Sequence, residues 1–232
     1  MVDRVASILE TVARSEYGLT LTELAKSLDA PVSSTQGLVN GLVAVGYLDE
    51  RERVYTLGAA PYMLNVLAGR PPVAAVMHNQ LQAVYDETGL TIMLSAAVGD
   101  HLIYVDHVAS DPRYAFLAEK HIRRPLLRTS AGWLHLADRE QRDIWTYLNS
   151  QPAQDEQLVD AFLASLTELR ETAVCVSPAV AVDDVDGVSV ALRENGRTIA
   201  VLGVVASRAD ISSRRDALLE VCLRHATNWG MR

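Results

Sequence analysis

The stretch Leu19–Leu57, LTLTELAKSLDAPVSSTQGLVNGLVAVGYLDERERVYTL, decides how the amino-terminal part of this chain folds. Thr20 and Glu23 have the spacing of a capping box, in which hydroxyl and carboxylate each accept from the other residue's amide, so a helix is predicted to follow. Pro31 suits the first position of a second helix, where its missing N–H and fixed φ carry no penalty. Residues 48–57 then read as two short extended runs around a charged turn. Helix, tight turn, helix and hairpin together predict a winged helix-turn-helix.

The second predicted helix has two different faces. At about 100° per residue, one face collects the apolar side chains, with Thr35 beside them. These inward residues are Leu38, Val39, Leu42 and Val45. The other face carries small or amide side chains: Ser33, Gln36, Gly37, Asn40 and Ala44. Because small side chains let the backbone approach closely, this face suits a DNA major groove, where Gln36 and Asn40 each offer an acceptor and donors to adenine.

Two glycines of this helix favour the same interpretation. In a helix interior Gly37 and Gly41 should each cost about 1 kcal/mol relative to alanine. That cost is easier to explain if bulk at these positions would clash with a bound partner. The alternative is that residues 19–57 form only a small helical packing unit, and we favour DNA binding over it.

The composition is that of an ordinary globular protein with room for two domains. The chain has 232 residues, 49% of them hydrophobic, and no stretch approaches the 18 or more apolar residues of a membrane span. Its amino terminus enters a helical pattern without a signal-peptide core, so we expect a cytoplasmic protein with no membrane partner. Cys175 and Cys222 are too few and too far apart for a disulfide framework or a zinc site. We expect buried thiols, no metal and no cofactor.

The charge balance is unusual for a protein that binds DNA. The chain has a net charge of -8, and residues 1–60 hold five basic against eight acidic side chains. Phosphate contacts would therefore come chiefly from Arg51 and Arg53, with Lys26 and Arg4, and from helix amino termini. We expect weak non-specific binding and a shallow dependence of affinity on salt.

The chain is predicted to contain two domains and a linker. Residues 1–60 form the winged helix-turn-helix, residues 61–72 a linker helix and hinge, and residues 73–232 a larger domain. In that domain the pattern predicts helices over 73–88, 139–148, 157–171 and from residue 210, a basic loop that turns into a helix over 123–137, and strands over 90–98, 102–108, 114–118, 174–182, 188–192 and 198–206. Helices packed on a largely antiparallel sheet give an α+β fold, typical of a sensor domain.

With these elements in view, the chain resembles the IclR family of bacterial transcriptional regulators. The similarity runs nearly end to end, through DRVASIL at 3–9, LTLTELA at 19–25, PVSST at 31–35, GYL at 46–48, YTLG at 55–58 and RRPLLRTSAG at 123–132. The resemblance implies a winged helix, a linker helix and a GAF-like effector-binding domain. It also implies double-stranded operator DNA, a small-molecule effector and further copies of the chain as partners, in dimers or tetramers that regulate catabolic operons. We expect a repressor.

Carried over position by position, the resemblance assigns site residues in both domains. DNA contact falls on the recognition helix, the residues before it and the wing: Thr20, Val32, Ser33, Ser34, Thr35, Gln36, Asn40, Arg51 and Arg53. Effector contact falls on the loop that contains Leu126, Thr129, Ser130 and Ala131, where Ser130 and Ala131 would offer backbone amides. Val190, Gly203 and Val205 stand where some relatives place a cysteine or serines.

The residues at these positions predict the chemistry of the effector. The three replacements at 190, 203 and 205 remove polar groups, and further apolar or aromatic walls are expected from Met93, Tyr104, Phe116 and Trp133. Desolvated apolar walls favour an aromatic or largely apolar ligand over a small polar acid. We expect an aromatic acid or a related compound, whose binding alters the placement of the two DNA-reading domains through the linker.

Two other classes of function remain open. An enzyme is suggested by GVSVA at 187–191, which resembles a nucleophile elbow but lacks its final glycine and following helix, so we expect Ser189 to be a structural strand serine. Cys175 has no identifiable basic partner. Three residues of the kinds that bind metals lie close together in the sequence: His101, Asp106 and His107. No further ligand at a spacing typical of a metal site accompanies them, so a metal site is not expected. The second alternative is a ligand sensor or protein-interaction module without DNA binding, which the acidic first domain keeps open.

Overall fold

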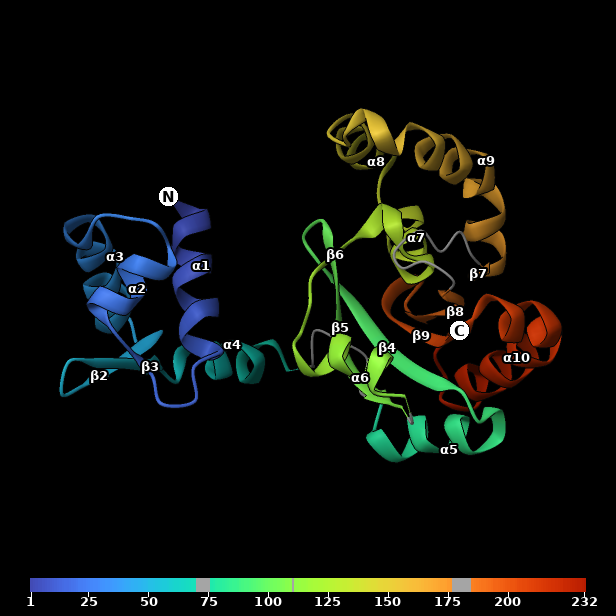
Figure 1. Ribbon diagram of the computed structural model, residues 1–232, viewed down its shortest axis with the longest axis horizontal. Coiled ribbons are helices and arrows are strands. Elements are labelled where there is room, and N and C mark those ends of the chain that lie inside the picture. The colour runs from blue at the N-terminus through green and yellow to red at the C-terminus, as the bar shows by residue number, and fades with distance from the viewer. Residues whose placement is uncertain (70–75, 110, 177–184) are drawn as a thin grey trace. The chain divides into compact units, whose positions relative to one another are not determined.

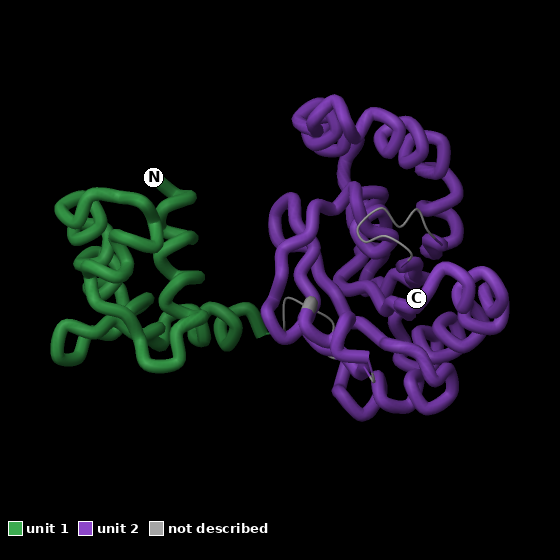
Figure 2. Tube along the Cα trace, in the orientation of Figure 1, with its two compact units in different colours: residues 1–72 green, residues 73–232 purple. Residues whose placement is uncertain are grey.

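The chain forms two compact units, residues 1–72 and 73–232 (Figures 1 and 2). The computed structural model describes residues 1–69, 76–109, 111–176 and 185–232. Among these residues, no helix combines the length and the apolar character that a bilayer span requires.

The amino-terminal unit is a winged helix-turn-helix, as the sequence predicts. Its elements are α1 (Val2–Ala13), β1 (Leu19–Thr20), α2 (Leu21–Ser27), α3 (Val32–Ala44), β2 (Leu48–Arg51), β3 (Val54–Leu57) and α4 (Ala60–Ala68). The strands pair antiparallel in the order β1-β3-β2. The three helices and the hairpin enclose one small core, formed by Ile8, Val12, Leu24, Val39, Leu42, Leu48 and Tyr55.

Local capping explains where α2 and α3 begin. The predicted capping box is present: Glu23 N donates to Thr20 Oγ1 at 3.4 Å, and Thr20 N donates to Glu23 Oε2 at 2.8 Å. Pro31 is the N-cap of α3, one residue earlier than the first helical position that the sequence suggested. Val45 was predicted to face the core, which is wrong: it follows the last residue of α3 and is 63% exposed.

The larger unit is a six-stranded antiparallel sheet with helices on both faces. The strand order is β6-β5-β4-β9-β8-β7. The strands are β4 (Thr91–Val98), β5 (His101–Val108), β6 (Arg124–Pro125), β7 (Val174–Val176), β8 (Val185–Glu194) and β9 (Arg197–Ser207). The helices are α5 (His78–Thr88), α6 (Pro112–Glu119), α7 (Ser130–Ala137), α8 (Gln141–Asn149), α9 (Glu156–Thr172) and α10 (Arg208–Asn228), with single 3-10 turns at η1 (Leu126–Arg128) and η2 (Ala153–Asp155).

Strand alternation gives this sheet two different faces. Val188, Val190 and Leu192 of β8 point toward the side that α5 and α10 cover, where they join a core with Leu81 and Leu218. The residues of β8 that alternate with these three point to the opposite side, where α7 covers the sheet. α8 and α9 pack behind α7 (Figure 1). The core on that side centres on Trp133 and Phe162, whose rings meet edge to face at 5.4 Å between centroids, together with Leu126, Leu134 and Tyr147.

Two strand predictions differ from the structure. Residues 114–118 were predicted as a strand, but they lie in α6. Asp111 caps this helix by accepting from Arg113 N at 2.9 Å, and Pro112 occupies its first turn, so local capping outweighs the apolar pattern. Of the strand predicted over 174–182, Val174–Val176 is β7 and the remainder lies outside the described residues. The same holds for 73–75 of the predicted helix 73–88 and for 70–72 of the predicted hinge.

Gly132 provides a stability test of the packing between α7 and η1. A methyl group there would overlap the carbonyl oxygen of Leu126 and lie 2.6 Å from its Cα. We expect Gly132→Ala to lower the free energy of unfolding by about 2–3 kcal/mol, because overpacking forces the backbone apart. Urea unfolding of the full chain measures this. Gly203→Ala is the matched control, since the nearest described atom to its new methyl, outside its chain neighbours, is Ser189 Oγ at 3.7 Å; an equal loss in both variants would contradict the prediction.

Candidate functional site

The outward face of α3 is exposed and carries little bulk, as predicted. Ser33, Gln36, Gly37, Asn40 and Gly41 are all exposed; we call them the outer stripe. A Cβ added at either glycine would meet nothing within 4 Å, so packing inside the chain does not require glycine at these positions. The stripe therefore leaves the helix backbone accessible to an external surface, at a cost of about 1 kcal/mol of helix propensity per glycine.

The hydroxyl groups assigned to DNA contact are mostly engaged within the protein. Thr35 is only 2% exposed, and its hydroxyl donates to the Pro31 carbonyl at 3.1 Å, so its side chain does not reach the outer surface and that assignment is wrong. Ser34 is exposed and donates to the same carbonyl at 2.9 Å. The Thr20 hydroxyl belongs to the capping box, where it also donates to Glu23 Oε2 at 2.8 Å. Val32 is 45% exposed beside the stripe.

The wing ends in a strained two-residue turn. Arg51 pairs with Val54 across the hairpin, and Glu52 and Arg53 between them have φ of 52° and 64°. Two successive residues with positive φ form a type I′ turn, whose twist matches that of the two strands. This turn favours Asn-Gly, and each bulky residue in the left-handed conformation costs about 1–2 kcal/mol. Arg51 and Arg53 are both exposed, so the strained tip presents cationic side chains to solvent.

In the larger unit, four small residues gather on the α7 side of the sheet. Strand pairing sets Ser189 opposite Gly203 and Gly203 opposite Met93 in one row across β8, β9 and β4. Ser130, the first residue of α7, is hydrogen-bonded to Ser189 through their hydroxyls at 2.8 Å, and Gly187 lies beside it. We call Ser130, Gly187, Ser189 and Gly203 the glycine–serine cluster. Because these residues lack large side chains, the sheet has little bulk where α7 begins.

Apolar residues border this cluster on the side of α6. Met93, Tyr114 and Ala118 form a separate small core, packed against Tyr104, Ile122, Val185 and Val205. Thr129 and Ala131, on either side of Ser130, are buried. The Thr129 hydroxyl caps α7 by accepting from Gly132 N at 3.0 Å. The first amides of α7, those of Ser130 and Ala131, point out of the helix without an intrahelical acceptor, as at any helix amino terminus.

Four of the residues predicted to contact an effector lie away from the glycine–serine cluster. Val190 is buried on the opposite sheet face against the α10 core, because one residue along a strand reverses its direction. Trp133 packs on Phe162, and its indole N–H donates to the Leu127 carbonyl at 2.7 Å. Leu126 is fully buried in that same core. Phe116 is on α6 and is 47% exposed, outside the apolar group that borders the cluster.

Titratable groups near the cluster are held neutral by burial. Burial raises the pKa of Tyr104, and it lowers the pKa of His135 to about 4. Burial also raises the pKa of the Cys175 thiol to about 12, so the reactive thiolate is not formed at neutral pH. Ser189 is bonded to a second hydroxyl rather than to a base, and it lies within a strand. These surroundings favour binding over nucleophilic chemistry.

One of the three candidate metal ligands makes a structural contact. Asp106 accepts from His78 Nδ1 at 3.0 Å, joining β5 to α5. Within the described part of the chain, no group of three or more His, Cys, Asp or Glu side chains is placed to hold a metal ion.

Comparison with known proteins identifies the architecture. The IclR helix-turn-helix domain matches residues 1–52, and the domain described as bacterial transcriptional regulator IclR, C-terminal, matches residues 66–228. The chain belongs to the IclR family. Its members are transcription regulators rather than enzymes, so this IclR-family protein binds DNA through its helix-turn-helix and carries an effector-binding domain.

Three relatives illustrate the similarity. The HTH-type transcriptional regulator TtgV of Pseudomonas putida is 23% identical over 184 residues, which cover 75% of this chain and 69% of TtgV. An IclR homologue from Microbacterium hydrocarbonoxydans, complexed with 4-hydroxybenzoate, has a TM-score of 0.73 at 19% identity, covering 98% of this chain and 96% of that one. The Agrobacterium tumefaciens repressor BlcR has a TM-score of 0.55 at 20% identity, covering 98% and 94%.

Sequence reasoning missed three residues of the cluster and its border. Ser189 is a structural strand serine, as predicted, but its hydrogen bond to Ser130 on the α7 face was not foreseen. Its alternation with Val188 and Val190 was the available signal, since small and large residues alternate there. Gly187 was considered only as part of an elbow motif. Tyr114 was assigned to a strand, which hid its place on α6 beside Met93.

The strained wing tip of this IclR protein gives a second test. We expect Arg53→Gly to raise the stability of the hairpin by about 0.5–1 kcal/mol, because glycine adopts a positive φ without strain. The same change removes a cation and should weaken DNA binding. Arg51→Gln is the matched control: it lies outside the left-handed turn, so it should weaken DNA binding without any gain in stability. Thermal unfolding and fluorescence anisotropy with labelled DNA measure the two effects; a less stable Arg53→Gly variant would refute the strain argument.

Proposed function

We propose that this IclR-family regulator represses a catabolic operon in the cytoplasm and responds to an aromatic acid or a related, largely apolar compound. The observation that carries the DNA-binding part is the exposed outer stripe of α3, whose glycines no contact among the described residues explains. Gln36 and Asn40 of this stripe supply the base-reading amides, and Ser33 and Val32 lie beside them. Arg51 and Arg53 of the wing supply phosphate contacts.

The regulator acts as a homo-oligomer in this proposal. The linker helix α4 exposes large apolar side chains on several sides: Tyr62, Met63, Leu64, Val66 and Leu67 are each between 45% and 77% exposed. A helix so apolar is typically covered by another surface. A second copy of the chain is the natural cover, since twofold dimers are the commonest assembly and place two recognition helices on successive half-sites. Two such dimers would give a tetramer.

The effector is proposed to bind at the glycine–serine cluster. Its hydroxyl pair and the amides of Ser130 and Ala131 suit a carboxylate, because a helix amino terminus attracts anions. Met93, Tyr104 and Val205 offer apolar walls for a ring on the same side. The relative from Microbacterium hydrocarbonoxydans, whose complex contains 4-hydroxybenzoate, supports an aromatic acid, and the repressor BlcR supports repression.

Replacing the amides of the outer stripe tests the DNA-binding surface. We expect Gln36→Ala and Asn40→Ala each to weaken binding to the specific site by 10-fold to 100-fold, the value of about 1–3 kcal/mol for a bidentate amide–adenine contact. Footprinting on DNA upstream of the protein's own gene measures this. Asn79→Ala on the exposed start of α5 is the amide control and should bind as the parent does. Unchanged protection in both stripe variants would overturn the proposed surface.

Filling the glycine–serine cluster tests the effector site. We expect Gly203→Val to weaken binding of 4-hydroxybenzoate by about 10-fold or more, because the added side chain occupies the space of the ligand. Isothermal titration calorimetry measures the affinity, and DNA binding without ligand should persist. Val105→Thr, a nearly isosteric change at an exposed position of β5, is the control for an unrelated substitution in the same sheet. If the parent chain binds no member of a panel of aromatic acids, the proposed effector class is wrong.

A further inference from the structure

The described residues contain a basic hollow that is separate from the glycine–serine cluster. It has a volume of about 370 Å³ and lies at the carboxyl end of α7. The hollow is lined by Ala137, Asp138, Arg139, Arg170, Arg193 and Gly196. The arginines come from three places in the chain: the end of α7, the end of α9 and the end of β8. We call Arg139, Arg170 and Arg193 the arginine cluster.

Helix capping accounts for part of this arrangement. Arg170 donates from Nε to the Ala137 carbonyl at 2.8 Å and from Nη2 to the Arg139 carbonyl at 3.3 Å. Arg193 donates from Nη1 to the Arg170 carbonyl at 3.3 Å. These carbonyls lie at helix carboxyl ends, where they lack intrahelical donors and where cations are favoured. The two side chains are thereby anchored beside the hollow.

Capping does not use the full hydrogen-bonding capacity of these side chains. A guanidinium has five N–H donors, and these contacts use two from Arg170 and one from Arg193. Among the described residues neither arginine has an ion-pair partner, and Arg193 Nε is buried without a hydrogen-bond partner. An unpaired, partly buried guanidinium is unfavourable unless an acceptor is supplied.

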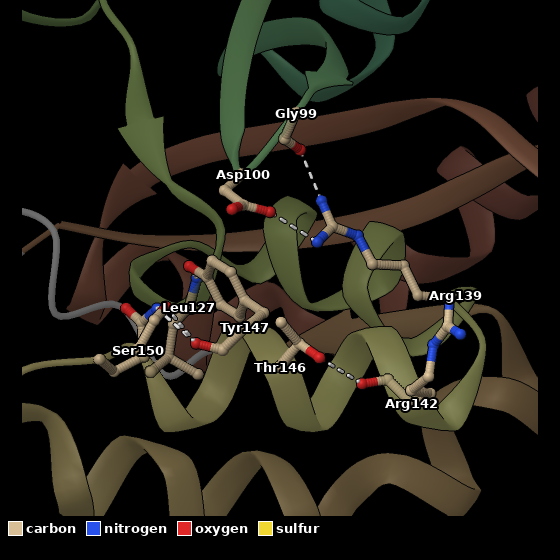
Figure 3. A network of polar contacts seen from close by, with 9 residues as sticks. Gly99, Asp100, Leu127, Arg139, Arg142, Thr146, Tyr147 and Ser150 are labelled. Atoms are coloured by element: carbon tan, nitrogen blue, oxygen red, sulfur yellow. Dashed lines mark hydrogen bonds and ion pairs between the residues drawn. The ribbon is translucent and has the colours of Figure 1, made fainter.

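The charges around the hollow leave an excess of positive charge. Arg139 is paired with Asp100 at 2.7 Å and also donates to the Gly99 carbonyl, as Figure 3 shows. Asp138 is the only carboxylate among the lining residues, and its Oδ2 accepts from Thr198 N at 2.7 Å. One carboxylate therefore faces Arg170 and Arg193 together, so the remaining charge favours an anion.

We propose that the arginine cluster binds a small oxyanion of the phosphate or carboxylate class. The planar fork of a guanidinium matches the oxygens of either group, and charge-assisted hydrogen bonds of this kind are about twice as strong as neutral ones. The hollow is large enough for a small organic anion. The oxygens of a bound anion would accept hydrogen bonds from the guanidinium N–H groups of Arg170 and Arg193 that helix capping leaves unused.

This anion site lies at the other end of the elements that carry the glycine–serine cluster. Ser130 begins α7 and Ala137 ends it, a distance of about 10 Å along the helix axis. On β8, Ser189 and Arg193 are four residues apart, about 13 Å along the strand. The two ligands therefore do not compete for the same residues, and the anion contacts α7 at the end opposite the proposed effector.

The test is titration of the full chain with inorganic phosphate and, separately, with citrate. Calorimetry at constant ionic strength, balanced with sodium chloride, separates site binding from general screening. We expect saturable binding of at least one of the two anions, and the tighter one identifies the class. Arg193→Gln should weaken it by about 10-fold or more, the effect of losing a charge-assisted contact. Arg197→Gln, an exposed arginine on the adjoining strand β9, is the matched control and should bind as the parent does.

Three results would overturn the proposal: no saturable binding of either anion, equal weakening in both variants, or unchanged affinity in Arg193→Gln. A circular dichroism spectrum identical to that of the parent shows that Arg193→Gln is folded. If it is not, Arg139→Gln replaces it and is expected to weaken binding, because its side chain also lines the hollow. Gly203→Val should keep the full anion affinity, so this test is independent of the effector proposal.

Discussion

Space left by missing side chains is the constraint on which both proposed sites of this regulator depend. On α3, Gly37 and Gly41 stand in a helix interior with nothing within 4 Å of an added Cβ. Each glycine weakens the helix, and no contact within the chain compensates. On the sheet of the larger domain, Gly187 lies beside Ser130 and Gly203 lies opposite Ser189, the two serines that share a hydrogen bond. On α3 the fold gives up helix propensity at a surface that is exposed, and on the sheet it places small buried residues beside the start of α7.

The surrounding packing makes that loss tolerable. The small core of the winged helix holds α3 through Val39 and Leu42, on the face away from the outer stripe. In the larger domain the face toward α5 and α10 is filled by large aliphatic side chains, and Trp133 and Phe162 anchor the layer behind α7. The hydrogen bond between Ser130 and Ser189 then joins the start of α7 to β8. If the effector binds at this point as proposed, it acts directly on the position of α7.

The sequence predicts much of this architecture because its signals are local. Thr20 and Glu23 specify the start of α2, and the charged turn at 52–53 specifies the wing. The two faces of the sheet were harder to predict, because which side chains share a face depends on pairing between strands that are far apart in the sequence. A shift of one residue placed Val190 instead of Ser189 at the candidate site, and strand alternation turns such a shift into the opposite face. Trp133 is an aromatic residue of the kind that can line a ligand site, but its ring packs on Phe162. Phe162 lies 29 positions away, so no local sequence pattern reveals that contact.

The most direct test of the central idea is one variant measured in two ways. If the outer stripe is kept small for an external surface, Gly37→Ala stabilises α3 by up to about 1 kcal/mol and at the same time weakens specific DNA binding. Urea unfolding and DNA titration on the same preparation give both quantities. A variant that is more stable and binds DNA less tightly is the predicted result. A variant that is more stable and binds DNA as tightly as the parent would contradict the account.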